Sequence, residues 1–320
     1  MRRLLWILFL LPLALACNRG NPLLPSAGGD NGGTAVLGEK TGQNEAPEPP
    51  RYTEISLKSQ SRRVPVIMYH DIIPERVRES QWFDCSVDEF EKQMNFLALE
   101  GAQPISLQDL YDHLTTGKDI PEKAVVLTFD DNYQGFYDNA WPILKRYGYP
   151  AAMFVHTGYV GNKEGQHPKM TWDTLRELVK DPLITIGAHT VMHPEDITLL
   201  TEDEQRKEVT DCKGVLEKEL GIKCDFFAYP AGKNNTITQR LAWEAGYKMA
   251  FTIDNGLAEE SPSIIAVNRY IHTRLETAWS DREDALRGGA MGIVRDTIEV
   301  APLELEVDTI SGVKLALITG

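Results

Sequence analysis

Four residues of the chain have the types and spacing of a hydrolytic metal site. Asp130 and Asp131 follow directly after the apolar run 124–129, and His189 and His193 follow the run 183–188. One Asp and two His commonly bind a divalent metal that keeps positions open for water and substrate. One of the adjacent carboxylates could bind the ion, which would offset their mutual repulsion, while the other accepts a proton from water. The pattern predicts metal-assisted hydrolysis.

Two further histidines also follow apolar runs, His70 after 64–69 and His156 after 151–155. Four of the seven histidines in the chain therefore stand at predicted strand ends. Each signal has a structural alternative, since paired acids often begin a helix and a histidine can be an ordinary buried side chain. The occurrence of all of them at strand ends favours a common site.

Apolar runs that alternate with amphipathic segments predict the elements that position these residues. The expected strands are 64–69, 124–129, 151–157, 183–189, 226–230, 249–253 and 264–271. The expected helices are 86–101, 106–117, 137–148, 171–181, 201–221, 237–246 and 276–289. Strands separated by helices indicate a parallel sheet with crossover connections, and their number suits a barrel. Such barrels carry their chemistry at the carboxyl ends of the strands.

The chain of 320 residues has a formal net charge of -14, which argues against binding to nucleic acid. Residues 1–16 contain two arginines followed by an apolar run too short to span a membrane, so we expect a signal peptide. The run ends in ALAC, which resembles a bacterial lipobox with Cys17 as the lipidated residue; the alternative is a plain signal peptide. Either alternative predicts an exported protein, and lipidation would anchor it in the membrane of a bacterial cell envelope.

The remaining segments predict a tether, one large domain and a short extension. Residues 17–60 are rich in Gly, Asn, Pro and Glu, a composition typical of a flexible tether. The folded domain is expected at 61–290, and 291–320 reads as a short β extension. Cys85, Cys212 and Cys224 show no zinc-binding spacing; Cys212 and Cys224 could form a disulfide, or all three could be free.

The motifs around these residues resemble those of the polysaccharide deacetylases with a NodB-homology domain, carbohydrate esterase family 4. VVLTFDDNYQG is similar to the first motif, with Asn132 in place of the usual Gly, and GAHTVMH is similar to the second. FAYPAG is similar to the third motif, and VPVIMYHDI resembles the opening strand of the exported poly-N-acetylglucosamine deacetylases. The resemblance implies an α/β fold, a distorted (β/α)7 TIM-like barrel.

The resemblance also implies a role for each matching residue. Asp130 would be the general base, and His70 the general acid. A divalent metal, zinc or else nickel or cobalt, would be held by Asp131, His189 and His193.

Further roles concern the residues around this set. Thr190 would support the loop between the two metal-binding histidines, and the Ala231 amide would bind the oxyanion. Ala228 stands where the family often has an Arg that pairs with the base, so Arg269 is the candidate to orient Asp130. His272 is a rival for the general acid.

Aromatic residues near the motifs could bind a sugar. Tyr229 and Trp172 are the substrate-binding candidates, and Tyr133 and Tyr137 are further members of this set; ordinary packing is the alternative for each.

The expected activity is hydrolysis of N-acetyl groups on a polysaccharide that contains N-acetylglucosamine. O-acetyl ester hydrolysis on a glycan and glycan binding without catalysis remain as alternatives.

Overall fold

The computed structural model describes residues 55, 57, 58, 61–165 and 167–291, and the backbone of two strands at 307–310 and 313–316. The predicted signal peptide, Cys17 and nearly all of the predicted tether lie outside the described residues. Among the residues described, no helix is both long enough and apolar enough to cross a membrane.

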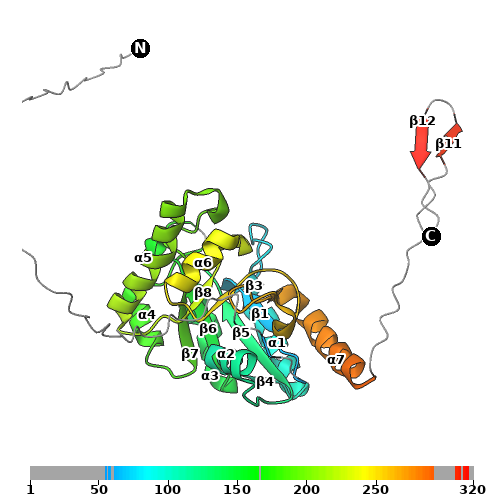
Figure 1. Cartoon of the computed structure of the whole chain (residues 1–320), viewed down its shortest axis with the longest axis horizontal. Helices are drawn as coiled ribbons and strands as arrows, with labels where there is room; N and C mark the ends of the chain where they lie inside the picture. Colours follow the sequence, from blue (N-terminus) through cyan, green and yellow to red (C-terminus); the bar gives the residue numbers. More distant parts are fainter. Residues whose placement is uncertain are drawn as a thin grey trace, which may run out of the picture. The chain divides into compact units, whose positions relative to one another are not determined.

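A curled parallel sheet forms the centre of the molecule (Figure 1). Its strands follow the order β10-β1-β5-β6-β7-β8-β9, and every neighbouring pair is parallel. Their bounds are β1 Val66–Tyr69, β5 Ala124–Phe129, β6 Ala151–Val155, β7 Ile184–Ala188, β8 Phe226–Ala228, β9 Met249–Phe251 and β10 Tyr270–Ile271. A parallel bridge pairs Phe251 of β9 with Val267, which precedes β10 in the chain. The sheet confirms the predicted distorted barrel of parallel strands.

The structure differs from the prediction in several short strands. The expected strand 264–271 is reduced to β10 and isolated bridges at Ala266 and Val267. Three strands were not predicted: β2 Ile72–Ile73 pairs with β3 Cys85–Ser86, and β4 Gln103–Pro104 pairs with β5. Near the C-terminus, β11 Val307–Ile310 and β12 Val313–Ala316 form a short antiparallel pair.

Seven α-helices accompany the strands in the described part of the chain, and local capping signals set their starts. Their bounds are α1 Val87–Leu99, α2 Leu107–Thr116, α3 Trp141–Tyr147, α4 Trp172–Leu178, α5 Glu202–Leu220, α6 Thr236–Glu244 and α7 Leu275–Met291. Ser86 caps α1 in a capping box with Glu89, and Thr201 caps α5 in the same way with Glu204. Each of these caps satisfies backbone N–H groups that the helix leaves free at its first turn.

Short turns of helix follow several of the strands. They are the π-helical η2 Phe136–Ala140 and the 3₁₀ turns η3 Thr157–Tyr159, η4 Ile197–Leu199, η5 Pro230–Gly232, η6 Ala258–Glu260 and η7 His272–Arg274. Three of them, η3, η5 and η7, begin within two residues of a strand end, where the predicted site residues lie.

An aromatic cluster fixes the ends of β1 and β5 beneath the predicted site. Phe129, the last residue of β5, stacks on Tyr69 at 5.0 Å and packs edge-on against Phe136 at 4.7 Å. Phe90 from α1 packs against both Tyr69 and Phe129. All four rings are fully buried. Because Asp130 follows Phe129 directly, this packing holds the start of the carboxylate pair in place.

The three cysteines of the folded part are buried and free. Cys212 and Cys224 therefore do not form the disulfide considered from the sequence. Burial raises the pKa of the Cys212 thiol to about 12, which keeps it protonated and unreactive at neutral pH.

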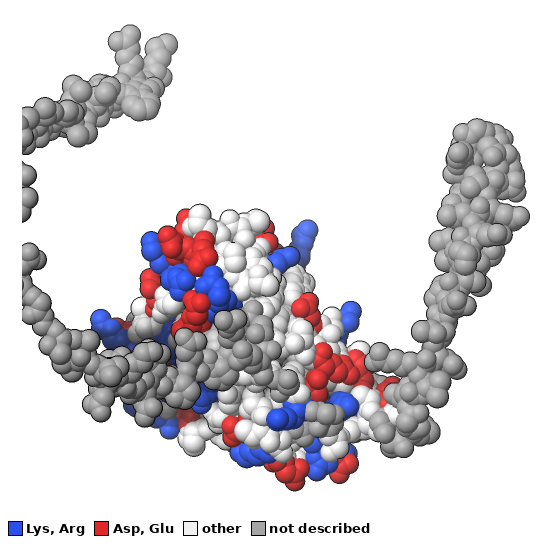
Figure 2. Space-filling view, in the orientation of Figure 1, with Lys and Arg blue, Asp and Glu red and all other residues white. Residues whose placement is uncertain are grey.

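Charges of both signs are interspersed on the molecular face shown in Figure 2. Arg240, for example, forms ion pairs with Glu202 and Glu244. This face offers no broad basic surface among the residues described.

We expect a buried ion pair between α2 and the segment near η6 to make stability depend on pH. His113 Nε2 lies 3.3 Å from Glu259 Oε1, and both side chains are buried. Burial lowers the pKa of His113. Glu259 and the Lys118 carbonyl raise this pKa by more than burial lowers it, so the net shift is upward. This stabilisation is complete below the unfolded pKa of about 6.5 and is lost as the pH rises through the folded pKa.

Urea unfolding of the native protein and of His113→Gln at several pH values measures this effect. The difference in unfolding free energy between the two proteins should shrink as the pH rises above about 6.5. A difference that stays constant across this range would contradict the expectation.

Candidate metal centre and active site

Asp130 lies at the carboxyl end of β5 and is held by a buried arginine. Arg269 donates from Nη1 to Asp130 Oδ1 and from Nη2 to Asp130 Oδ2, each at 2.8 Å. The same guanidinium donates from Nε to the Thr252 carbonyl at 2.8 Å. Arg269 is fully buried and Asp130 is 2% exposed. This two-point contact fixes the plane of the Asp130 carboxylate.

Asp131, His189 and His193 form a group that can hold a metal ion. One ligand atom from each lies within 4.8 Å of the others. Asp131 Oδ1 is 3.4 Å from His189 Nε2 and 3.5 Å from His193 Nε2. Tetrahedral coordination with bonds of about 2.1 Å would place ligand atoms about 3.4 Å apart. Asp131 Oδ1 is buried and has no hydrogen-bond partner among the described residues, which also fits a position kept for a cation.

Hydrogen bonds hold the ring of His189 and the main chain of His193. His189 Nδ1 lies 2.8 Å from the Ala228 carbonyl at the end of β8, so it donates there and its Nε2 lone pair faces Asp131. Thr190 Oγ1 accepts the His193 N–H at 3.1 Å. Glu208 of α5 accepts the N–H groups of Val191 and Met192 between them. Hydrogen bonds therefore hold the main chain of this loop at Val191, Met192 and His193.

The backbone of the site is unusual. Among the described residues, every non-glycine residue with a positive φ belongs to a loop of the site: Asp131 at 73°, Asn132 at 42°, Thr190 at 68°, His193 at 48° and Ala231 at 48°. This left-handed region disfavours side chains with a Cβ atom, at about 1–3 kcal/mol for each residue. The surrounding contacts must hold these loops against that cost.

The pKa values of both carboxylates of the site lie below their usual range. Burial raises the pKa of Asp130, but Arg269 and His189 outweigh it and hold the pKa below its usual value. Burial also raises the pKa of Asp131, but His189, His70 and Lys169 outweigh it and hold this pKa well below its usual value. Ionised carboxylates are the forms that bind a cation or accept a proton.

His70 lies at the end of β1 beside these carboxylates. Burial lowers the pKa of His70, and the charges of Asp131 and Asp130 oppose that shift without reversing it. The ring also packs against Phe83 at 5.1 Å.

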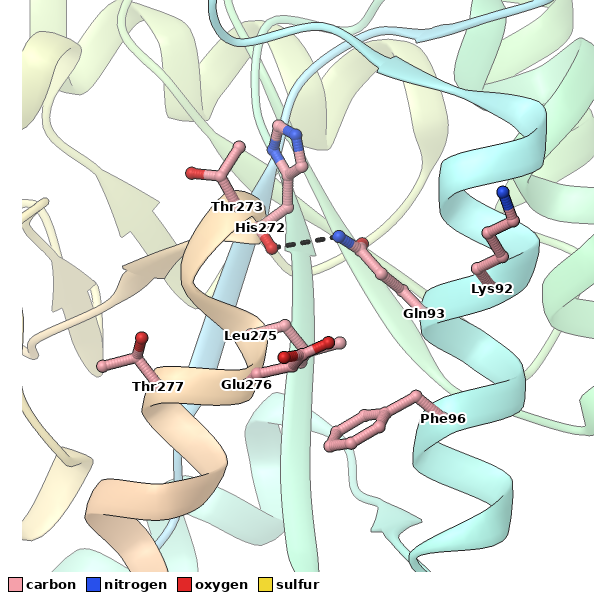
Figure 3. Close-up of a pocket in the computed structure, with 8 residues that line it drawn as sticks. All are labelled: Lys92, Gln93, Phe96, His272, Thr273, Leu275, Glu276 and Thr277. Atoms are coloured by element: carbon pink, nitrogen blue, oxygen red, sulfur yellow. Dashed lines mark hydrogen bonds between the residues drawn. The ribbon is translucent and has the colours of Figure 1, made fainter.

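His272, the rival candidate, is buried beside Tyr69. Its ring stacks on Tyr69 at 5.4 Å, and burial lowers its pKa to about 4. Its carbonyl accepts a hydrogen bond from Gln93 across a pocket of about 330 Å³ between α1 and the start of α7 (Figure 3). In Figure 3 the imidazole points away from Phe96 and Glu276, which also line this pocket.

The predicted substrate-binding residues occupy different positions. Tyr229 is fully buried, and its hydroxyl donates to the Ile265 carbonyl at 3.0 Å, so its ring offers no face to a sugar. The prediction for Tyr229 was wrong because packing, which the sequence motif does not reveal, encloses the ring. Trp172, the first residue of α4, is partly exposed, and Ala231 lies exposed in η5 directly after β8.

Tyr133 and Tyr137 also have other partners. Tyr133 is 7% exposed, and the Lys169 ammonium lies 3.3 Å from its ring centre. Tyr137 donates to Glu177 at 2.7 Å.

Two residues that were not assigned a role from the sequence lie against Asp131. Lys169 donates to the Asp131 carbonyl at 3.0 Å. His156, at the end of β6, has its Nε2 atom 3.7 Å from Asp131 Oδ1. The position of His156 after an apolar strand was the one available signal, and no feature of the sequence indicated Lys169.

A curled parallel sheet with an Asp-His-His group at its carboxyl edge defines an α/β-barrel protein with a candidate hydrolytic metal centre. Residues 117–250 match the family model described as polysaccharide deacetylase. The chain is 30% identical over 207 residues to YxkH of Bacillus subtilis (strain 168), named as a polysaccharide deacetylase, across 65% of this chain and 70% of that protein. The chain therefore belongs to the polysaccharide deacetylase family, whose members are hydrolases.

Other relatives are similar over part of their length. The poly-beta-1,6-N-acetyl-D-glucosamine N-deacetylase of Escherichia coli (strain K12) is 26% identical over 232 residues, which are 61% of this chain and 34% of that protein. The chain thus spans about a third of this relative.

Solved deacetylase structures share the fold. Deacetylase PplD of Streptococcus pyogenes, in complex with acetate, matches 69% of this chain and 98% of its own, with a TM-score of 0.62 and 28% identity. IcaB of Ammonifex degensii matches 70% of this chain and 98% of its own, with a TM-score of 0.62 and 26% identity. These matches confirm the family and the fold expected from the sequence.

Proposed function

We propose that the chain is a metal-dependent N-deacetylase that acts on a polysaccharide containing N-acetylglucosamine. The observation that carries the proposal is the Asp131, His189 and His193 group with the Arg269-bound carboxylate of Asp130 beside it. Asp131, His189 and His193 would hold a divalent cation, most simply zinc, with nickel or cobalt as alternatives. When bound there, such an ion polarises an acetyl carbonyl and makes water more acidic.

Asp130 acts as the general base in this proposal. Its carboxylate is ionised, buried and fixed in orientation by Arg269. The lone pairs that do not accept from Arg269 remain to take a proton from the attacking water. His189 Nε2 lies 4.0 Å from Asp130 Oδ2, which places the base next to the ligand group.

The leaving amine needs a proton, because an unprotonated amine leaves poorly. His70 supplies it in this proposal, since its ring is close enough to Asp130 and Asp131 for both to affect its pKa. His272 is the weaker candidate, because the charges that affect its pKa are those of His70, Glu89 and Arg76 rather than the two site carboxylates.

The tetrahedral oxyanion needs donors as well. The proposed donor is the backbone N–H of Ala231, held in the left-handed turn after β8. Trp172, partly exposed at the start of α4, remains the proposed sugar contact.

The names of the relatives support the class of substrate. The E. coli relative is named for deacetylation of poly-beta-1,6-N-acetyl-D-glucosamine. We carry this substrate class to the present chain as part of the proposal. The sequence further supports export and anchoring of the enzyme in a bacterial cell envelope through a lipidated Cys17.

Removal of divalent metal is expected to abolish catalysis. Treatment of the purified protein with a chelator should stop acetate release from N-acetylglucosamine oligomers, and addition of zinc, nickel or cobalt should restore it. The reason is that the neutral amide is a poor electrophile without a cation at its carbonyl oxygen.

Released acetate and new free amines measure this reaction, with O-acetylated oligosaccharides assayed in parallel. Release that persists after complete metal removal would contradict the metal dependence. Release from O-acetyl esters alone would replace the N-deacetylase proposal with an esterase.

A further inference from the structure

His156 is a buried imidazole that faces the candidate metal centre from a third strand. It follows β6, it is 3% exposed, and its Nε2 atom lies 3.7 Å from Asp131 Oδ1. The ring packs edge-on against Tyr159 at 4.9 Å and an interplanar angle of 80°, and its centroid is 5.8 Å from that of His193. Its position next to Asp131 thus has packing support on two sides.

Backbone hydrogen bonds join the His156 segment to both loops that carry the metal-binding group. Asn132 Oδ1, next to Asp131, accepts the His156 N–H at 3.1 Å. The next two N–H groups, of Thr157 and Gly158, donate to the carbonyls of Thr190 and Val191. The segment is thus tied to the Asp131 loop on one side and to the histidine loop on the other. These bonds limit how far the imidazole can move relative to Asp131.

Asp131 Oδ1, the acceptor at this contact, is buried and has no hydrogen-bond partner among the described residues. His156 Nδ1, the ring nitrogen that does not face Asp131 Oδ1, is also buried without a partner there. Burial of a carboxylate oxygen costs free energy unless the oxygen contacts a cation or accepts a hydrogen bond. A single carboxylate oxygen has enough lone pairs to bind a cation and accept a hydrogen bond together. His156 Nε2 is the nitrogen of that ring that lies near Asp131 Oδ1.

We propose that His156 is a positioning residue of the metal centre, which donates its Nε2 proton to Asp131 and so fixes the carboxylate for the ion. The separation of 3.7 Å exceeds the upper limit of about 3.2 Å for an N–H···O hydrogen bond, so the two atoms must approach by at least about 0.5 Å to form the bond. The group whose ligand atoms lie within 4.8 Å of one another consists of Asp131, His189 and His193. His156 lies outside that group, and it therefore acts through Asp131 rather than as a fourth ligand.

Metal affinity tests this role without an activity assay. Partners that orient metal ligands typically contribute 10- to 100-fold to affinity. We expect His156→Leu to weaken binding of zinc and cobalt about 10- to 100-fold, measured by competition with a chelating dye. His156→Gln should recover most of the affinity, because its amide Nε2 can donate from nearly the same place.

The cobalt absorption spectrum separates a positioning residue from a ligand. Both His156 variants, saturated with Co²⁺, should keep the visible bands of the native protein, because the ligand set is unchanged. A change in band position and intensity that indicates a lost nitrogen ligand would overturn the proposal and make His156 a ligand.

His272→Leu is the matched control, since His272 is another buried imidazole with unpartnered ring nitrogens in the described part of the chain. It should leave metal affinity unchanged. Equal affinities of the native protein and His156→Leu would overturn the role of His156.

The inference rests on the proposed metal centre, and the same titration tests the two separately. Failure of the native protein to bind metal would overturn both. Tight native binding with no effect of His156→Leu would overturn the role of His156 alone.

Discussion

Asp130→Asn is expected to slow acetate release by about 10²- to 10⁴-fold, the usual contribution of a general base. Asparagine keeps the shape of the side chain and one acceptor oxygen for Arg269, but its amide cannot take a proton from water. Metal affinity should change little, because Asp130 lies outside the group formed by Asp131, His189 and His193. Steady-state kinetics with N-acetylglucosamine oligomers, together with bound-metal analysis, measure both effects.

The neighbouring substitution Asp131→Asn is the matched control for this experiment. It also neutralises one buried carboxylate, but it removes a proposed ligand, so bound metal and activity should fall together. A rate for Asp130→Asn within about twofold of the native rate would rule out the assigned base, because a base contributes at least about 10²-fold.

Arg269→Met is expected to destabilise the protein by about 3–5 kcal/mol at neutral pH. The substitution leaves the 2% exposed carboxylate of Asp130 without its buried cation, and an unpaired buried charge is costly. Because Arg269 holds the pKa of Asp130 down, its contribution is present above the unfolded pKa of about 3.9. The contribution is lost as the pH falls through the folded pKa of Asp130. Urea unfolding at pH 7 and at lower pH values measures the loss.

Arg240→Met provides the comparison for Arg269→Met. Arg240 also pairs with two carboxylates, but its side chain is 40% exposed. Such exposed pairs contribute about 0–1 kcal/mol. Equal destabilisation by the two substitutions would contradict the expectation that the buried Arg269–Asp130 pair contributes more to stability than an exposed pair. Arg269→Lys, which keeps the charge but loses the two-point contact, should fall between native and Arg269→Met.

Much of the fold could be predicted because hydrophobic periodicity and capping residues act locally. The run 124–129 is β5 to the residue, and Ser86 and Thr201 start α1 and α5 as their types indicate. The strand expected at 264–271 shrank to two residues, since its pairing depends on tertiary contacts with β1 and β9 that no local pattern encodes.

The candidate site could be assembled from strand ends because parallel strands deliver their carboxyl ends to one edge. For this reason the positions of the Asp130–Asp131 pair, His189 and His193 after their apolar runs indicated a common site, and the family resemblance then selected Asp131 as the ligand. The partners of these residues were harder to predict. For His156 the only signal in the sequence was its position after an apolar strand. Lys169 contacts Asp131 from an irregular segment, whose path no periodic pattern of the sequence predicts.

The left-handed backbone at Asp131, Asn132, Thr190, His193 and Ala231 has a consequence for laboratory evolution. Glycine adopts this conformation without the steric cost, so glycine at some of these positions can raise thermal stability. Asp131 and His193, however, carry proposed metal-binding groups. A screen for heat resistance alone would therefore select variants that have lost the activity, and variant libraries should leave these codons unchanged.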